Sequence, residues 1–373
     1  MENRKIHIVS LDVPFPPDYG GMMDVFYRIK SLNELGFDII LHSFTYGRGE
    51  PKELEKYCSE VHFYKRTKSV SSLFSKRPFI VETRKSTELL ERLKSDNHPI
   101  LLEGLHCCWF LEQLKNSGRL IFVRTHNIEH DYYKALGESS KGLKKIFFQS
   151  EAKKLRSYEA TLRFASALLA IQNEDLDHFQ KLNKSTYLLP ASFPNLELVE
   201  EKEIQEYYLF HGNLSVQEVH DSALWLLQEV VPNLGKIQFK IAGKNPSQSL
   251  IEAAKSSSIE LIINPNQQEM SELILKAKLH VLPTTQETGL KLKLLLALQC
   301  VGKTIVNSKQ LAGNNLHEFC LVANSGEEFI AIIKEEFAKP IAFEERKIAI
   351  ETFKKRMNIH DQLRNVLQKL DII

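Results

Sequence analysis

Short apolar runs alternate with longer stretches of helical periodicity along most of the chain. A run of four to eight apolar residues predicts a strand buried on both faces, as in a parallel sheet. In the first half such runs lie at residues 5–11, 37–44, 100–103, 120–125, 167–171 and 186–189. Helical patterns separate them, for example over residues 22–35, where Gly36 ends the pattern. The first half therefore predicts a parallel sheet covered by helices.

The same pattern restarts in the second half. Strands are predicted at residues 207–211, 237–242, 260–263, 279–282 and 303–306, with helices that include 221–230 and 289–299. Between the halves, residues 191–205 are rich in Pro and Glu and lack apolar periodicity, which is typical of a linker. We expect a first domain at 1–190 and a second at 191–355, with a C-terminal helix at 356–373 packing back on the first.

The expected fold class is α/β, with two Rossmann-like, doubly wound domains facing a cleft. The length of 373 residues suits two domains. In open parallel sheets, ligands bind at the carboxyl ends of the strands near a topological switch point. With two such domains, the cleft between them is the expected place for a site.

Composition and charge narrow the class of protein. Hydrophobic residues make up 43% and charged residues 26%, an ordinary globular balance. The net charge of +2 gives no signal for nucleic acid, and we expect no nucleic-acid partner. Five cysteines without metal-ligand spacing indicate reduced thiols. No apolar run reaches the about 18 residues of a membrane span, and the start of the chain lacks a signal-peptide core, so we expect a cytoplasmic protein.

A proline-rich loop with two glycines, Gly20 and Gly21, follows the first predicted strand and precedes the first predicted helix. Glycines let the backbone come close to a ligand, and the N–H groups that begin a helix can face an anion. The alternative is a loop that only turns the chain.

Polar residues crowd the end of the run at 120–125, namely Arg124, His126, Asn127 and Glu129. A histidine at the carboxyl end of a strand can hydrogen-bond a sugar hydroxyl or move protons near neutral pH. The alternative is a turn in which Asn127 caps the next helix.

A third polar loop, at residues 283–290, contains Gly289 and leads into a helical pattern that carries Lys291 and Lys293. A helix start with lysines suits a diphosphate. Residues two apart do not share a helical face, so we expect one lysine at most to point at phosphate. The alternative is an ordinary loop with solvated lysines.

Taken together and in order, these segments resemble the family 4-like retaining glycosyltransferases of the GT-B fold, in their mannosyltransferase-like branch. The resemblance also rests on F-x-G-N-L at 210–214, I-A-G-x-N-P at 241–246 and G-K-x-x-V at 302–306, and it covers about residues 5–310. It implies transfer from a nucleotide-diphospho-sugar with retention of configuration and without a metal ion or other cofactor.

The resemblance also implies roles for single residues. Gly20 and Gly21 approach the donor phosphates, and His126 lies beside the transferred sugar. Donor contacts are implied for Asn213, Glu287, Gly289, Lys291 and Lys293, and contacts on the acceptor or sugar side for Arg124, Asn127 and Glu129. The acceptor is expected to be a saccharide or a lipid-linked glycan.

Three positions depart from the pattern of the family that the chain resembles. Leu296 stands where the family places a glutamate that binds the donor ribose, and Thr288 stands at an earlier glutamate position. Leucine accepts no hydrogen bond, so Glu287 is the candidate substitute. Asn213 also stands where an arginine is common. The alternative function is therefore a catalytically degenerate relative that binds a glycan or joins an assembly.

Two basic and apolar stretches, 64–80 and 141–156, lie in the first half. The first 190 residues carry 29 Lys and Arg against 24 Asp and Glu. Such stretches can contact anionic lipid at the inner face of a membrane or receive a lipid-linked acceptor. The alternative is a solvated helix face that packs on the core of the domain.

Overall fold

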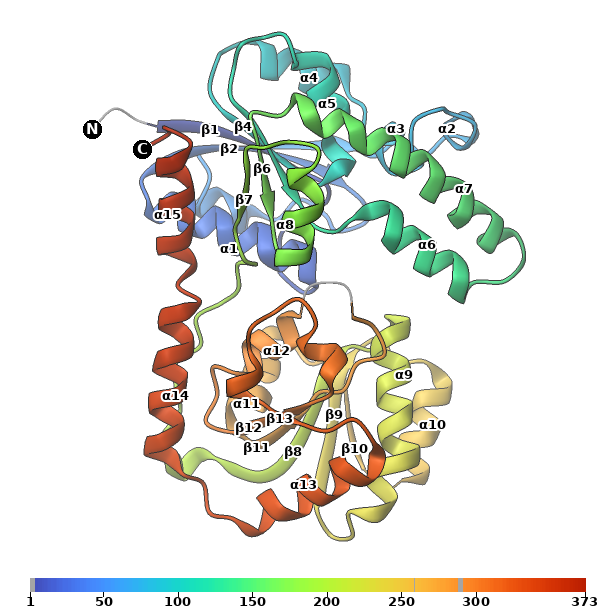
Figure 1. The fold of residues 1–373 in the computed structure, drawn as a ribbon, viewed down its shortest axis with the longest axis vertical. Helices are drawn as coiled ribbons and strands as arrows, with labels where there is room; N and C mark the ends of the chain where they lie inside the picture. The colour runs from blue at the N-terminus through green and yellow to red at the C-terminus, as the bar shows by residue number, and fades with distance from the viewer. Residues whose placement is uncertain (1–3, 258, 288–290) are drawn as a thin grey trace. The chain divides into compact units, whose positions relative to one another are not determined.

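The computed structural model describes residues 4–257, 259–287 and 291–373. The chain divides into two compact units (Figure 1). The first unit comprises Met1–Ser192 together with Ile359–Ile373, and the second comprises Phe193–Asn358. Each unit is built around one parallel sheet.

The sheet of the first unit has seven strands in the order β3-β2-β1-β4-β5-β6-β7. Their bounds are β1 (Arg4–Ser10), β2 (Phe37–Thr45), β3 (Glu60–Lys65), β4 (Ile100–Glu103), β5 (Ile121–Thr125), β6 (Ala167–Ala170) and β7 (Thr186–Leu188). All neighbours run parallel. The strand order reverses between the central strands β1 and β4. The topological switch point of the sheet therefore lies between the carboxyl ends of these two strands.

Helices cover both faces of this sheet. They are α1 (Gly20–Glu34), α2 (Val70–Leu73), α3 (Phe79–Glu82), α4 (Thr87–Lys94), α5 (Trp109–Leu114), α6 (Glu129–Ser139), α7 (Gly142–Tyr158), α8 (Asn173–Gln180) and α15 (Ile359–Lys369), with 3-10 turns η1 (Lys52–Lys56), η2 (Leu105–Cys107) and η3 (Glu159–Phe164). Successive strand residues point to opposite faces. In β4, Ile100 and Leu102 join one apolar cluster and Leu101 joins the other, so both faces are buried.

The last helix of the chain, α15, belongs to the first unit and lies beside α1 (Figure 1). Its residues Leu363, Val366 and Leu367 are buried in the same cluster as Met22 and Val25 of α1. The spacing of three and four residues places these side chains on one helical face, which explains why a short helix at the end of the chain packs there.

The sheet of the second unit has six parallel strands in the order β10-β9-β8-β11-β12-β13. Their bounds are β8 (Gln205–Asn213), β9 (Gln238–Lys244), β10 (Glu260–Ile263), β11 (Ala277–Val281), β12 (Lys303–Val306) and β13 (Leu321–Val322). The switch point lies between β8 and β11.

The helices of the second unit alternate with its strands. They are α9 (Gln217–Trp225), α10 (Gln248–Ser256), α11 (Gln267–Lys276), α12 (Leu292–Ala297), α13 (Gly326–Ala338) and α14 (Phe343–Arg356), with a π turn η5 (Leu226–Val230) and 3-10 turns η4 (Glu201–Glu203), η6 (Val231–Asn233), η7 (Ser308–Leu311) and η8 (His317–Phe319). Local sequence fixes several helix starts. In α11 the Asn266 side chain accepts from the Glu269 N–H while the Glu269 carboxylate accepts from the Asn266 N–H.

The predicted α/β class is confirmed, and every predicted strand exists within a few residues of its expected bounds. The pattern missed β3 and β13. The sequence of β3, EVHFYK, mixes polar and apolar residues because it lies at the sheet edge, and β13 has only two residues. Among the described residues, no helix is both long and apolar enough to cross a membrane.

Candidate functional site

In the first unit the candidate residues gather at the carboxyl ends of the strands around the switch point. Glu103 ends β4, and His126 directly follows β5, the next strand of the sheet. The His126 Nε2 and the Glu103 Oε2 are 2.9 Å apart, and both residues are buried. Because the Glu103 carboxylate accepts a hydrogen bond from Nε2–H, it fixes the ring orientation and leaves Nδ1 as the acceptor nitrogen.

Two arginines neutralise the carboxylates beneath this pair. Arg28 donates to both oxygens of Glu103, at 2.5 and 2.6 Å, and at 2.8 Å to Asp24. Arg124 donates to Asp24 at 3.0 Å. Burial would raise the pKa of Glu103, but the Arg28 charge and the hydrogen bond from His126 outweigh it and lower that pKa. Glu103 is therefore a carboxylate at neutral pH.

The glycine loop lies against the free side of His126. Gly20 begins α1, and a Cβ added to Gly21 would lie 3.9 Å from the His126 Nδ1. That nitrogen is buried and makes no hydrogen bond to any described residue. On the other side of the ring, Gly104 has φ +79°, and a Cβ there would meet His106 at 2.9 Å and His126 at 3.4 Å. Gly104 is thus required by its positive φ and by the nearness of His106, whereas a Cβ at Gly21 would make an ordinary van der Waals contact with the imidazole.

The other predicted residues of this segment have interior partners. Arg124 is completely buried, and its guanidinium also donates to the carbonyls of Leu189 and Pro190. It therefore positions β5 through these contacts. Asn127 does not cap α6, because Ile128 occupies the N-cap position; its side chain instead hydrogen-bonds Glu129.

Glu129 is an unusual carboxyl group. Burial raises its pKa to about 7, so that at neutral pH it is partly protonated. Its Oε1 lies 3.9 Å from the His106 Nδ1, and neither atom has a hydrogen-bond partner among the described residues.

In the second unit two glycines let the chain pack closely on itself at the end of β8. Gly212 has φ +156°, and a Cβ added to Gly243 of the neighbouring β9 would lie 2.0 Å from the Gly212 carbonyl oxygen. Asn213 ends β8, and its Oδ1 accepts from the N–H and the hydroxyl of Ser215, at 3.2 and 2.7 Å. Asn213 therefore shapes the turn that leads to α9.

Both predicted lysines lie near one carboxylate, that of Glu218 on α9. The Lys293 Nζ is 3.2 Å from the Glu218 Oε1, and the Thr284 hydroxyl donates to the same oxygen. The Lys291 Nζ donates to the Gln286 carbonyl at 2.8 Å. Burial lowers the pKa of Lys291 to about 8, and the Glu218 charge opposes this shift; burial also lowers the pKa of Lys293.

The other positions considered for donor binding are Leu296, Glu287, Thr288 and Gly289. Leu296 lies on α12, half-buried, and packs against the cluster that contains Ile274 and Leu209. Glu287 is exposed. Thr288 and Gly289 lie outside the described residues.

Several site residues were missed from the sequence. Glu103 could have been noticed as a charged residue that ends an apolar run, and Asp24 and Arg28 as an i,i+4 pair on the apolar face of a helix. Thr284 lies in the polar loop predicted at residues 283–290, but nothing in the sequence marked Glu218, because only the fold brings α9, β11 and α12 together.

Comparison with known proteins gives a family match for the second unit and solved structures of similar fold. Residues 205–336 match the family model described as glycosyl transferases group 1. A Klebsiella pneumoniae protein, the "uncharacterized 44.6 kDa protein in cps region", is 26% identical over 347 residues, which are 86% of this chain and 87% of that one. Among solved structures, Anabaena Alr3699/HepE in complex with UDP has a TM-score of 0.68 at 12% identity, over 99% of this chain and 100% of that one. A glycosyltransferase from Rickettsia africae ESF-5 has a TM-score of 0.66 at 13% identity, over 100% and 99%.

Two parallel α/β units, each with polar residues at the switch point of its sheet, define the two-domain GT-B fold that these solved structures share. Within this fold, residues 205–336 match the family model described as glycosyl transferases group 1, and they lie in the second unit.

Proposed function

We propose that the protein transfers a hexose from a nucleotide-diphospho-sugar to a saccharide or lipid-linked glycan, with retention of configuration. The observation that carries the proposal is the His126–Glu103 pair, whose buried Nδ1 has no hydrogen-bond partner among the described residues and lies against Gly21. A buried acceptor beside a glycine loop suits a sugar hydroxyl, because an unpaired polar atom is costly without a ligand.

The second unit would hold the nucleotide diphosphate. Transfer requires stabilisation of the charge that develops on the departing diphosphate. Lys291 and Lys293 would supply cations for this, because both lie near the start of α12. We propose that these groups, rather than a metal ion, neutralise the leaving group. The UDP in the Anabaena structure supports a uridine diphosphate donor as the first one to test.

The direct test is calorimetric titration of the full chain with UDP, GDP and their common sugars. We expect a Kd in the micromolar range for one nucleotide and release of that nucleotide when an acceptor is added. Absence of binding at millimolar concentration of every ligand would contradict the proposal.

One observation favours a second candidate function, a relative that binds a glycan without catalysis. Leu296 places an apolar side chain on α12, at the position where the resemblance implies a ribose-binding carboxylate. The parent chain would then bind neither nucleotide nor nucleotide sugar, while it would still bind a saccharide from the pathway of its acceptor. The name of the Klebsiella relative refers to a cps region, so fragments of the polysaccharide made by such a region are the first saccharides to test.

We also propose that the acceptor side carries a membrane-contact surface, which consists of Val70, Leu73, Phe74, Leu143 and Ile146. These side chains are 74, 42, 84, 85 and 64% exposed. The Lys154 Nζ donates to the Leu73 carbonyl at 3.0 Å, which joins α7 to α2. Exposed lysines flank these residues in the sequence, at positions 68, 76, 144 and 145. Exposed apolar side chains among lysines favour contact with anionic lipid.

Sedimentation with vesicles tests this surface. We expect the chain to bind vesicles that contain anionic phospholipid more than neutral vesicles, and we expect the double variant Phe74→Ser/Leu143→Ser to lose the binding. Ile348→Ser is the matched control, because Ile348 is 65% exposed on α14, in the other unit. Equal loss in the control, or no preference for anionic lipid, would contradict the proposal.

A further inference from the structure

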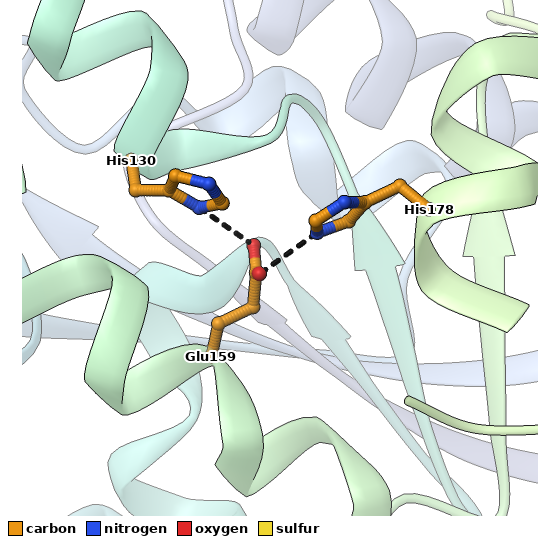
Figure 2. Close-up of side chains that lie close together, drawn as sticks. All are labelled: His130, Glu159 and His178. Atoms are coloured by element: carbon orange, nitrogen blue, oxygen red, sulfur yellow. Dashed lines mark hydrogen bonds and ion pairs between the residues drawn. The ribbon is translucent and has the colours of Figure 1, made fainter. Parts of the chain in front are cut away.

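A second group of polar side chains lies in the first unit, apart from the residues assigned to sugar transfer. His130 lies in the first turn of α6, Glu159 lies where α7 passes into η3, and His178 lies in the last turn of α8. Figure 2 shows the two imidazole rings approaching the Glu159 carboxylate from opposite sides. One ligand atom from each residue lies within 4.8 Å of the other two.

The distances in this group are close to those of a metal site. The His130 Nδ1 is 3.4 Å from the Glu159 Oε1, and the His178 Nε2 is 2.8 Å from the Glu159 Oε2. Tetrahedral zinc with bonds of about 2.0–2.1 Å separates its ligand atoms by about 3.3 Å. The first pair already has this spacing. The second must open by roughly half an ångström, which His178 can supply because its side chain is 28% exposed.

Burial and charge also favour a cation here. Glu159 is 5% exposed, and the ion pairs that the described residues make to its carboxylate come from the two histidines. The His130 Nδ1 is buried and makes no hydrogen bond to a described residue, although it faces a carboxylate oxygen. A buried imidazole nitrogen that faces a carboxylate oxygen is stabilised by a proton or by a metal ion between the two atoms. A metal ion would bind His130, Glu159 and His178 at the same time.

A second three-residue group in the same unit differs from this one in the positive charges that surround its carboxylates. Asp24, Glu103 and His126 also converge, and all three are buried. There, however, Arg28 and Arg124 already supply the positive charge. A metal ion would have to displace a guanidinium from that group, whereas the carboxylate of Glu159 has imidazoles around it.

We propose that His130, Glu159 and His178 bind a divalent transition-metal ion, with Zn²⁺ as the expected ion and water in the fourth position. Two imidazole nitrogens and one carboxylate oxygen suit zinc, while magnesium and calcium prefer oxygen ligands. The ion cross-links α6, η3 and α8, and so holds the start of α6 at Glu129, three residues after His126, against the segments on either side of β6. Sequence spacing could not reveal the group, because its members lie far apart between positions 130 and 178.

Calorimetry on the full chain, stripped of metal with a chelator and titrated with zinc chloride, tests the proposal. We expect one equivalent of Zn²⁺ to bind, and we expect Glu159→Gln and His178→Ala to weaken that binding by at least about 100-fold, because loss of a direct ligand exceeds the effect of losing an outer partner. His178→Ala is the variant that keeps the fold most safely, since this side chain is partly exposed.

His62→Ala is the matched control. His62 Nε2 lies 2.9 Å from Glu60 Oε2, but this pair is not part of a three-ligand group among the described residues. The control should bind zinc like the parent. Cobalt substitution gives a second readout: a tetrahedral nitrogen and oxygen spectrum supports the site, while a thiolate charge-transfer band assigns the ion to a cysteine. Equal zinc affinity in the parent and both ligand variants would overturn the proposal. None of these readouts depends on sugar transfer, so the outcome is separate from that of the proposed function.

Discussion

The two units differ in how charged side chains are paired near the switch points of their sheets. In the first unit the carboxylates of Asp24 and Glu103 are held by Arg28 and Arg124, and His126 is fixed by Glu103. These side chains are therefore held in place by one another, and a ligand that bound beside them would not first have to order them.

In the second unit, two partly buried lysines, Lys291 and Lys293, lie near the Glu218 carboxylate. Lys293 shares the Glu218 carboxylate with Thr284, and burial lowers the pKa of both Lys291 and Lys293. A lowered lysine pKa means that the charged form is disfavoured in the ligand-free protein. An anion such as a diphosphate would offset this cost. The comparison predicts that substitutions in the first unit alter catalysis and stability, whereas those in the second alter nucleotide affinity and its pH dependence.

The largest expected effect is on the rate of sugar transfer. His126→Ala should lower kcat by about 10²–10⁴-fold, the usual contribution of a positioned acid, base or polar catalytic group. Nucleotide affinity, measured by calorimetry, should change little, because His126 lies in the first unit. His360→Ala, which removes a partly exposed histidine of α15, is the control and should keep full activity. A rate that survives the loss of His126 would remove this residue from the mechanism.

The next effect is on the free energy of unfolding. Arg28→Met keeps the length of the side chain but leaves Glu103 and Asp24 with less positive charge in the core. Breaking a buried ion pair in this way costs about 3–5 kcal/mol. Urea denaturation of the variant and the parent measures the difference. Arg92→Met, which removes a half-exposed surface pair with Glu88, should cost no more than about 1 kcal/mol. Similar losses in both variants would show that the interior network is not the stabilising feature.

The order of elements was predictable from the sequence, but the pairing of charges was not. Runs such as residues 100–103 are apolar because both faces of β4 are covered, and this leaves a clear signal. His126 and the glycines were likewise found, because they follow strands in short polar loops. Glu103, Arg28 and Asp24 were missed, since their contacts join β4 to α1 across 75 residues of chain. Side-chain pairing over such separations depends on the register of the sheet and not on any local pattern.

A smaller effect is expected from restoring a carboxylate in the second unit. Leu296→Glu should tighten nucleotide binding by roughly 10- to 100-fold, corresponding to a charged hydrogen bond worth about 1.5–3 kcal/mol. Leu296→Gln is the matched control of similar size without the charge. Because Leu296 also packs against an apolar cluster, folding of each variant must be checked by its unfolding midpoint. If calorimetry gives equal affinities for parent, Glu and Gln variants, the nucleotide does not contact this position.

The smallest effect, and the sharpest test of the second unit, is the pH dependence of nucleotide binding. With a pKa of about 8, Lys291 is mostly charged at pH 7 and mostly neutral at pH 9. Loss of this charge should weaken UDP binding by up to about tenfold over that interval. The effect of rising pH on the stability of the fold has the opposite sign to its effect on UDP binding. The unfolded chain, with an ordinary lysine pKa, binds more protons between the two pKa values, so the contribution of Lys291 to stability rises with pH in that window.

The variant Lys291→Met separates this lysine from other titrating groups. Its UDP affinity should be lower at pH 7 and nearly independent of pH up to 9, apart from any titration of the ligand itself. Lys293→Met should keep the pH dependence while losing affinity at every pH, because it removes a different cation beside Glu218. If instead the affinity of the parent is constant from pH 7 to 9, Lys291 does not face the diphosphate, and the positive charge of the second unit must act through Lys293.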